Sequence, residues 1–257
     1  MIQQLFAEFS ALPQVEAIAL GGSRAGTNYD EKSDYDVYLY CISPVSEEVR
    51  RKILEKYCSY MEIGNHFWEY EDNCTLNNGI DIDILYRNLD DFTADLATVV
   101  EQCRGRNGYT TCMWHNLRTC KIIYDREGRL IAAKARFDIP YPQKLKEDII
   151  DRNWKLLRSA MPAYELQIRK AVNRGDLISI NHRVSAFMES YFDLLFALNE
   201  KTHPGEKRLI PLCKAMCPLL PEQFEENIQL LLSHLFTEPA LVQGDLDRIL
   251  TALSKIL

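Results

Sequence analysis

The sequence predicts an α/β (α+β) domain, a sheet flanked by helices, followed by an all-helical bundle. Segments with the alternating or continuous apolar character of strands end near residue 125, and helical periodicity dominates from about residue 141. The charge is also uneven. Residues 141–257 hold 15 basic and 15 acidic side chains, whereas the first 140 hold 15 basic and 22 acidic ones, which gives the net charge of −7. We therefore expect two domains, 1–140 and 141–257.

The first domain is expected to begin with a helix over residues 2–12, whose apolar side chains recur at helical spacing and which Pro13 ends. The turn residues Asn77-Asn78-Gly79 predict a hairpin between two strands. A polar loop is expected ahead of the last strand. In chain order, the remaining elements are expected to be a buried strand at 15–20, a short helix at 23–25, a strand at 33–41, a helix at 46–61, strands at 65–76 and 79–89, a helix at 90–103 and a strand at 120–125.

The second domain begins with amphipathic helices. Residues 184–200 are apolar almost all round, which predicts the central helix of a bundle. A loop over 202–207 separates it from two final helical segments, 219–236 and 244–257.

Composition excludes several classes of protein. The eight cysteines contain no CxxC pair, so we expect reduced and mostly buried thiols; Cys213 and Cys217 lie one helical turn apart. The acidic balance argues against a broad nucleic-acid-binding face. No apolar run reaches the length of a membrane span, and the first residues have no basic leader, so we expect a cytoplasmic protein.

Two aspartates share one face of the strand expected at 33–41. Side chains alternate across a strand, so Asp34 and Asp36 face the same way as Tyr38 and Tyr40, whereas the opposite face is fit for a core. Two carboxylates this close repel each other unless a cation or solvent offsets the repulsion. Because Mg²⁺ is commonly held by one or two carboxylates together with substrate phosphates, the pattern predicts a site for one or two such ions.

The strand expected at 79–89 repeats the pattern. Its isoleucines face one way, and Asp81, Asp83 and Arg87 face the other. If the two strands are neighbours in one sheet, a third carboxylate joins the first two. Three carboxylates with two metal ions are suited to in-line attack on a phosphorus atom.

A glycine-serine turn, Gly21-Gly22-Ser23, follows the strand expected at 15–20. Glycine lets the backbone approach a ligand closely, and the start of a helix offers N–H groups to phosphate oxygens. Ser23 adds a hydroxyl, and Arg24 either grips the γ-phosphate or is a solvated side chain. Gly22, Ser23 and Arg24 are therefore candidates to bind phosphate oxygens, and the resemblance described next implies that the phosphates are those of a nucleotide.

These motifs, in this order, resemble the signature of the polymerase-β-like nucleotidyltransferase superfamily: Gly-Gly-Ser, then Asp-x-Asp at 34–36, then an acid on a separate strand that reads IDILYR at 82–87. The match is tight over 21–36 and 80–87. Through the helical domain the layout is loosely similar to small bacterial aminoglycoside and lincosamide nucleotidyltransferases. The resemblance implies a mixed sheet, with two Mg²⁺ ions held by Asp34, Asp36 and Asp83, and with Asp83 accepting the proton of an acceptor hydroxyl.

Some roles stay open at this stage. Asp81 and Asp83 share a face, so strand parity cannot choose between them, and the match of IDILYR favours Asp83. Lys207 and Arg208 either reach phosphates from the helical domain or lie on the surface. His115 has no partner at metal-binding spacing, which favours a structural role.

The sequence therefore predicts a Mg²⁺-dependent nucleotidyltransferase, adenylyltransferase-like and of the EC 2.7.7 type, whose helical domain forms the other wall of the cleft. The resemblance implies that AMP moves from ATP, or a nucleoside monophosphate from another nucleoside triphosphate, to a hydroxyl of an antibiotic-like small molecule. The alternatives are transfer to tRNA or protein, as in toxin systems, and a nucleotide-binding module without turnover. The base, the acceptor and the oligomeric state stay open.

Overall fold

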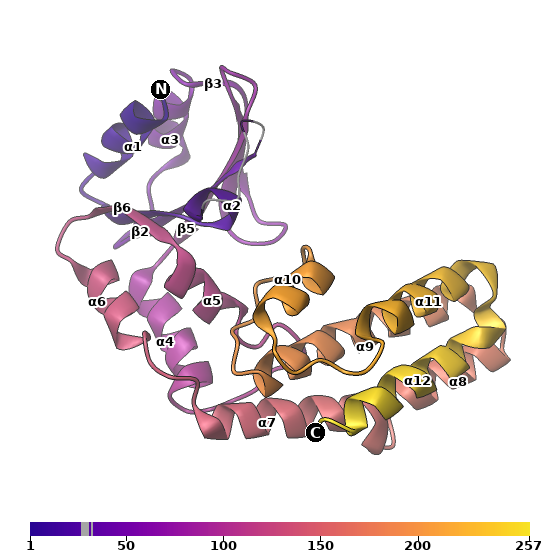
Figure 1. The fold of residues 1–257 in the computed structure, drawn as a ribbon. Coiled ribbons are helices and arrows are strands. Elements are labelled where there is room, and N and C mark those ends of the chain that lie inside the picture. The colour runs from indigo at the N-terminus through magenta and orange to yellow at the C-terminus, as the bar shows by residue number, and fades with distance from the viewer. Residues whose placement is uncertain (27–30, 32) are drawn as a thin grey trace. The chain divides into compact units, whose positions relative to one another are not determined.

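The computed structural model describes residues 1–26, 31 and 33–257, and the chain divides into two compact units (Figure 1). The first unit contains residues 1–97 and 116–139, and the second contains residues 98–115 and 140–257. The predicted first domain, 1–140, thus includes a segment, 98–115, that packs within the second unit. Residues 27–30 and 32, between the glycine-serine turn and the two aspartates, lie outside the described residues.

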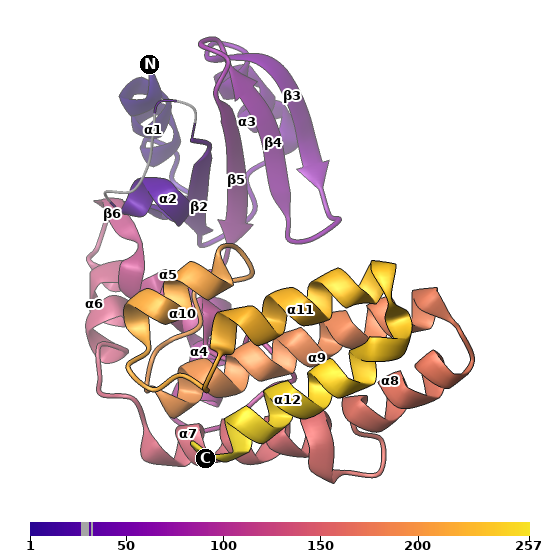
Figure 2. The same cartoon turned by 45° about the vertical axis from the view of Figure 1, so that its right-hand side comes forward.

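Within the described part of the first unit, six strands form one mixed sheet in the order β3-β4-β5-β2-β1-β6 (Figure 2). The neighbours β2 and β5 run parallel, and the other neighbouring pairs run antiparallel. The predicted mixed sheet is confirmed, and the two aspartate-bearing strands, β2 and β5, are neighbours, which is the condition under which a third carboxylate can join the first two. The strands are β1 (Val15–Leu20), β2 (Tyr35–Cys41), β3 (Cys58–Asn65), β4 (Glu71–Leu76), β5 (Asp81–Arg87) and β6 (Lys121–Asp125).

Helices α1 and α3 cover one face of this sheet, because their buried apolar side chains join one core with Val37 and Leu39 of β2 and with Ile82 and Ile84 of β5. On the other face, the Phe92 ring of α4 lies 5.7 Å from the Tyr40 ring. The helices whose residues lie in this part of the chain are α1 (Ile2–Ser10), α2 (Gly22–Ala25), α3 (Glu47–Leu54), α4 (Leu89–Val100), α5 (Cys112–Thr119) and α6 (Arg129–Arg136).

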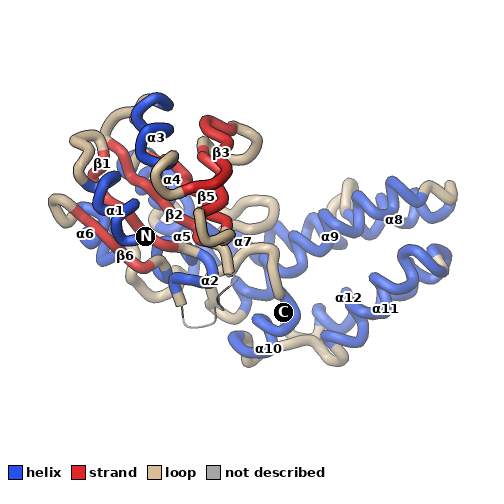
Figure 3. Tube along the Cα trace, turned by 90° about the horizontal axis from the view of Figure 1, so that it is seen from above, coloured by secondary structure: helices blue, strands red, loops and turns tan. Residues whose placement is uncertain are grey.

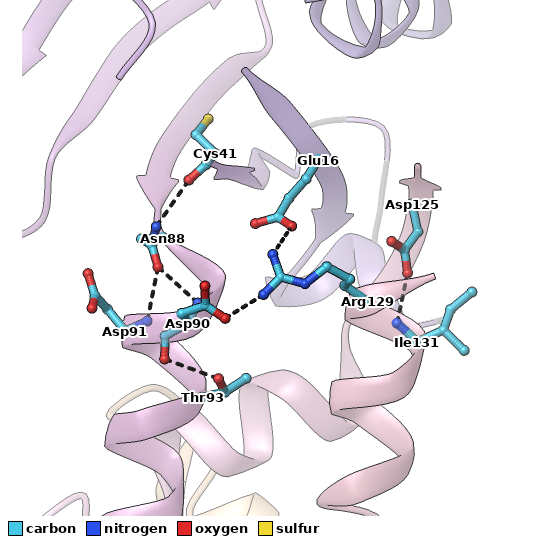
Figure 4. A network of polar contacts seen from close by, with 9 residues as sticks. All are labelled: Glu16, Cys41, Asn88, Asp90, Asp91, Thr93, Asp125, Arg129 and Ile131. Atoms are coloured by element: carbon cyan, nitrogen blue, oxygen red, sulfur yellow. Dashed lines mark hydrogen bonds and ion pairs between the residues drawn. The ribbon is translucent and has the colours of Figure 1, made fainter. Parts of the chain in front are cut away.

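Polar contacts fasten α4 and α6 to the sheet (Figure 4). Arg129 of α6 donates to Glu16 of β1 at 2.7 Å and also pairs with Asp90 of α4. Asn88 precedes α4, accepts a hydrogen bond from the Asp90 backbone N–H at 2.9 Å, and donates to the Cys41 carbonyl at the end of β2 at 3.5 Å. The C-terminal ends of β2 and β5 are therefore anchored by the helix that follows them.

The second unit has helices only among its described residues, and Figure 3 shows the strands in the first unit. Its core is built around α9, whose C-terminal half is buried almost all round, as predicted for the central helix of a bundle. The elements after residue 140 are α7 (Gln143–Trp154), a π-helical turn (Lys155–Ser159), α8 (Tyr164–Asn173), α9 (Leu177–Leu198), α10 (Leu209–Met216), α11 (Phe224–Thr237), a 3-10 turn (Pro239–Leu241) and α12 (Val242–Ser254).

Three sequence-based expectations for the first unit are wrong. The helix expected at 46–61 ends at Leu54, and its last residues begin β3, because pairing with β4 outweighs their helical pattern. The strand expected at 65–76 starts only at Glu71. The polar loop contains α5, whose Trp114 and Leu117 are buried. Helix α6, which follows β6, was not among the expected elements.

The eight cysteines all lie in described parts of the chain and are free thiols, six of them buried, as predicted. Among the described helices, none is long and apolar enough to cross a membrane.

Candidate functional site

The glycine-serine turn connects β1 to the short helix α2 and lies directly against β2. The Gly21 N–H donates to the Asp36 carbonyl at 2.8 Å, which extends the β1–β2 pairing by one step. Gly22 has a φ of +54°, and a Cβ atom added there would lie 1.8 Å from Oδ2 of Asp36. Only glycine therefore allows the Asp36 carboxylate to lie this close to the backbone of the turn.

Ser23, the next residue, has a buried hydroxyl. Among the described residues, its Oγ atom has no hydrogen-bond partner. A buried hydroxyl without a partner costs free energy, and a ligand oxygen or nitrogen that forms a hydrogen bond with it recovers that cost. The Gly22–Ser23 turn thus combines a close backbone approach with an unsatisfied polar atom, which fits a phosphate-binding role.

Arg24 holds the backbone that leads into β2. Its Nε donates to the carbonyls of Ser33 at 2.7 Å and Asp34 at 3.1 Å, and its guanidinium lies 3.9 Å from the centroid of the Tyr35 ring. These contacts position the start of β2. A direct contact between Arg24 and a nucleotide stays a prediction.

Asp36 and Asp83 are brought together by strand pairing. In the parallel β2–β5 pair, Asp36 is directly opposite Asp83, so their side chains lie on the same face. Asp81 is exposed and accepts a hydrogen bond from Thr75 at 2.8 Å. The structure therefore places Asp83 beside Asp36 and leaves Asp81 at the margin of the sheet.

Asp34 immediately precedes β2 and is half-buried. In the part of the chain that the structure describes, no three His, Cys, Asp or Glu side chains gather into a group that could hold a metal ion. The three predicted aspartates thus do not form a three-carboxylate cluster in this structure, and the metal-binding role of Asp34 stays a prediction. The pair formed by Asp36 and Asp83 meets the smaller requirement of Mg²⁺, one or two carboxylates with phosphate oxygens completing the shell.

The neighbouring strand β4 adds polar residues that sequence reasoning missed. Asn73 is opposite Asp83 and donates from Nδ2 to Asp83 Oδ1 at 2.8 Å. Burial raises the pKa of Glu71, a hydrogen bond from Asn73 lowers it, and the nearby charge of Asp83 raises it. The sequence signal was available: Glu71, Asn73 and Thr75 alternate along EDNCTL and face the same way as the aspartates.

Toward the C-terminal ends of β2 and β5, the side chains on this face of the sheet pair with one another and are buried. Glu69 accepts two hydrogen bonds from Arg87, at 2.8 and 2.6 Å, and the Arg87 guanidinium lies 4.2 Å from the centroid of the Tyr38 ring. Tyr38 and Tyr40 are buried, as predicted for packing residues, and burial raises the pKa of Tyr38. This end of the face is closed, so the polar end near Asp36 is the candidate site.

The remaining candidates lie in the second unit. His115 Nδ1 is 2.8 Å from Thr202 Oγ1, a contact of the structural kind that the sequence favours. Lys207 and Arg208 are exposed, and Arg208 has a φ of +57° at the start of α10. A phosphate contact from either cation stays a prediction.

Comparisons with known proteins add the following. A family model described as a domain of unknown function, DUF4037, matches residues 110–209, less than half of the chain and outside the turn and the aspartates. No curated protein matches the sequence.

Two solved structures cover 100% of this chain. One is a nucleotidyltransferase-like protein from Exiguobacterium sibiricum 255-15, with 12% identity, a TM-score of 0.46 and 74% of that chain covered. The other is an aminoglycoside 6-adenyltransferase from Bacillus subtilis, with 9% identity, a TM-score of 0.30 and 89% of that chain covered. Because both TM-scores are below 0.5, a function has to be argued from the residues of the site.

Proposed function

We propose that this protein is a Mg²⁺-dependent nucleotidyltransferase that moves a nucleoside monophosphate, AMP from ATP in the leading case, to an acceptor hydroxyl. The observation that carries the proposal is the pairing of Asp36 with Asp83 on parallel strands, with the Asp36 carboxylate against Gly22. The unpartnered hydroxyl of Ser23 lies next to Gly22 in the same turn. Two carboxylates beside a glycine-serine turn suit a metal-nucleotide complex.

Each residue has a distinct task in the proposed reaction. The backbone at Gly22 and the Ser23 hydroxyl bind the triphosphate, and Asp36 and Asp83 hold Mg²⁺, with Asp34 as the predicted additional ligand. When bound, Mg²⁺ would neutralise charge on the phosphate oxygens. The acceptor oxygen forms a bond to the α-phosphorus while the bond from that phosphorus to the bridging oxygen breaks. Asp83 takes the hydroxyl proton, and pyrophosphate leaves.

The acceptor is proposed to be a small molecule with a free hydroxyl. Transfer to tRNA or protein, the alternative that the sequence leaves open, is a different outcome of the same experiment. The protein is incubated with Mg²⁺ and nucleotides labelled at the α-phosphate, against separate pools of aminoglycosides, lincosamides, tRNA and protein. The pool that gains label identifies the acceptor class.

The matched variants are Asp36→Asn, which removes a carboxylate of the pair, and Asp81→Asn, which removes the exposed aspartate two residues from Asp83. We expect loss of labelling in the first and near-normal labelling in the second. Unchanged labelling in Asp36→Asn would sink the assignment. Calorimetry with ATP and Mg²⁺ that shows tight binding, with no pyrophosphate release against any pool, would indicate a binding module instead.

A further inference from the structure

One row of side chains crosses four strands on the polar face of the sheet. Strand pairing sets Asp36 of β2 opposite Asp83 of β5, Asp83 opposite Asn73 of β4, and Asn73 opposite Glu62 of β3. Neighbouring strands lie about 4.8 Å apart, so adjacent members of such a row can touch. The row continues the proposed carboxylate pair to the edge of the sheet.

Hydrogen bonds connect the part of the row beyond Asp83. Asn73 donates to Asp83 Oδ1 at 2.8 Å. Asn65 Nδ2 donates to Asn73 Oδ1 at 2.6 Å and to Glu62 Oε2 at 3.2 Å. An amide nitrogen carries two hydrogens, so Asn65 can make both contacts at once.

These contacts fix which way the Asn73 amide points. If the amide were turned over, its oxygen would face the Asp83 carboxylate and its nitrogen would face the nitrogen of Asn65, and both contacts would become repulsive. The Asn73 nitrogen therefore faces Asp83. This nitrogen donates a hydrogen bond to Oδ1 of Asp83, so Oδ2 is the carboxylate oxygen that a ligand can contact.

We propose that Asn73 is a positioning residue for Asp83: its amide holds one carboxylate oxygen and so orients the other for the metal and the acceptor hydroxyl, and Asn65 fixes that amide. Asn73 acts through Asp83 and does not itself touch the substrate. The inference rests on the proposed function, since Asp83 must take part in nucleotide transfer. Residues that orient metal ligands typically change metal affinity or activity by about 10- to 100-fold when they are removed.

The chain offers a matched control two residues away. Thr75 lies on the same strand and face as Asn73, and it donates to Asp81 at the same distance, 2.8 Å. Asp81 is exposed and is not opposite Asp36. Thr75→Ala thus removes an equivalent cross-strand hydrogen bond without touching Asp83.

The test measures two quantities on the full chain: the affinity for Mn²⁺ alone by electron paramagnetic resonance, and the kcat and KM of label transfer. For Asn73→Ala we expect Mn²⁺ affinity or kcat to fall by about 10-fold or more, with KM for the nucleotide nearly unchanged. For Thr75→Ala we expect both to stay within about twofold of wild type. Asn73→Asp keeps the shape but puts a second negative charge beside Asp83, so it should change Mn²⁺ binding and transfer even if Asn73→Ala folds poorly.

A double-mutant cycle separates action through Asp83 from action elsewhere, for example on Glu71. Adding Asn73→Ala to Asp83→Asn should cause no further loss in either quantity. A further loss in the double variant, or Asn73→Ala behaving like Thr75→Ala, would overturn the positioning role. If Asp83→Asn and Asp36→Asn both retain wild-type transfer, the proposed function itself fails, and the two failures are therefore distinguishable.

Discussion

Two aspartates, one in each unit, are held by an asparagine amide at nearly the same distance. Asn73 donates to Asp83 at 2.8 Å, and Asn153 donates to Asp193 at 3.0 Å. Asp83 is half-buried and, among the residues that the structure describes, receives this donor alone. Asp193 is 1% exposed and also accepts two hydrogen bonds from Thr110, from its N–H at 2.9 Å and from its hydroxyl at 2.7 Å.

The difference shows what each carboxylate can do. Both oxygens of Asp193 accept hydrogen bonds from the protein itself, and these bonds join the segment 98–115 to α9 in a buried network. One oxygen of Asp83 accepts the hydrogen bond from Asn73, and the carboxylate keeps further acceptor capacity that a ligand can use. A similar local contact thus serves structure in one unit and the proposed chemistry in the other.

The largest expected effect is a loss of stability when Asp193, the fully buried aspartate of the two, is removed. Asp193→Ala would leave the donors of Thr110 and Asn153 buried without an acceptor, so the free energy of unfolding should fall by about 3 kcal/mol or more. Asp83→Ala should change it by less than about 1 kcal/mol, since water reaches that site. Urea unfolding of both variants measures these changes in the free energy of unfolding. Equal losses of stability would contradict the proposed difference between the two carboxylates.

The pH dependence of stability sharpens the same contrast. Burial raises the pKa of Asp193 from 3.8 to about 6, against the hydrogen bonds that lower it. Between these values the native state binds more protons than the unfolded state, so the free energy of unfolding falls as pH rises from about 4 to 6, by up to about 3 kcal/mol.

Asp193→Asn should remove this dependence, and unfolding of wild type and variant at pH 4.5 and 7 tests it. His203 acts in the opposite direction. Burial lowers its pKa to about 4, so the unfolded state binds more protons below pH 6.5 and stability falls as pH falls. The difference between wild type and variant isolates Asp193, and a difference that does not vary with pH would contradict the assignment.

A smaller effect is expected at the glycine that admits the Asp36 carboxylate. At Gly22 an alanine has both a positive φ and a clash with Asp36. At Gly79, where φ is +81°, an added Cβ has no atom of the described residues within 4 Å apart from those of its own residue and chain neighbours. Each substitution should cost about 1–2 kcal/mol of stability through backbone strain. Only Gly22→Ala should also reduce nucleotide transfer, by about 10-fold or more, because it displaces Asp36. Equal transfer rates in the two variants would show that the close approach does not matter.

The smallest effect concerns Ser23. Its buried hydroxyl has no partner among the described residues, so Ser23→Ala removes a desolvation cost and should raise the free energy of unfolding, by about 1 kcal/mol. Nucleotide affinity, measured by calorimetry with ATP and Mg²⁺, should fall about 10-fold, since a hydrogen bond to a charged group is worth about 1.5–3 kcal/mol. Unchanged affinity would remove Ser23 from the proposed site.

The sequence was sufficient for elements whose pattern is local. The buried strand β1, the central helix α9 and the two faces of β2 follow from periodicity within each segment. The helix expected at 46–61 failed because its second half becomes an edge strand only when β4 is present to pair with it.

The site could be predicted in part for the same reason. The aspartates and the glycine-serine turn are local motifs, but the row from Asp36 to Glu62 depends on the register of four strands, which no single segment specifies. Asp193 lies within an apolar helix, and its partner Thr110 is 83 residues away in sequence. Asp83 could therefore be recognised from its motif, but its hydrogen bond from Asn73 and the buried role of Asp193 could not be recognised before the fold was known.

The insertion of residues 98–115 into the second unit has a consequence for how this protein can be divided. Neither unit is one continuous stretch of chain, so a break at residue 140 would separate Thr110 from Asp193 and leave each fragment with part of a buried polar network. Truncation, domain exchange or fusion at that boundary would therefore yield two incomplete pieces. The piece that keeps both units intact is the whole chain. A helical unit transferred to another protein would have to include residues 98–115.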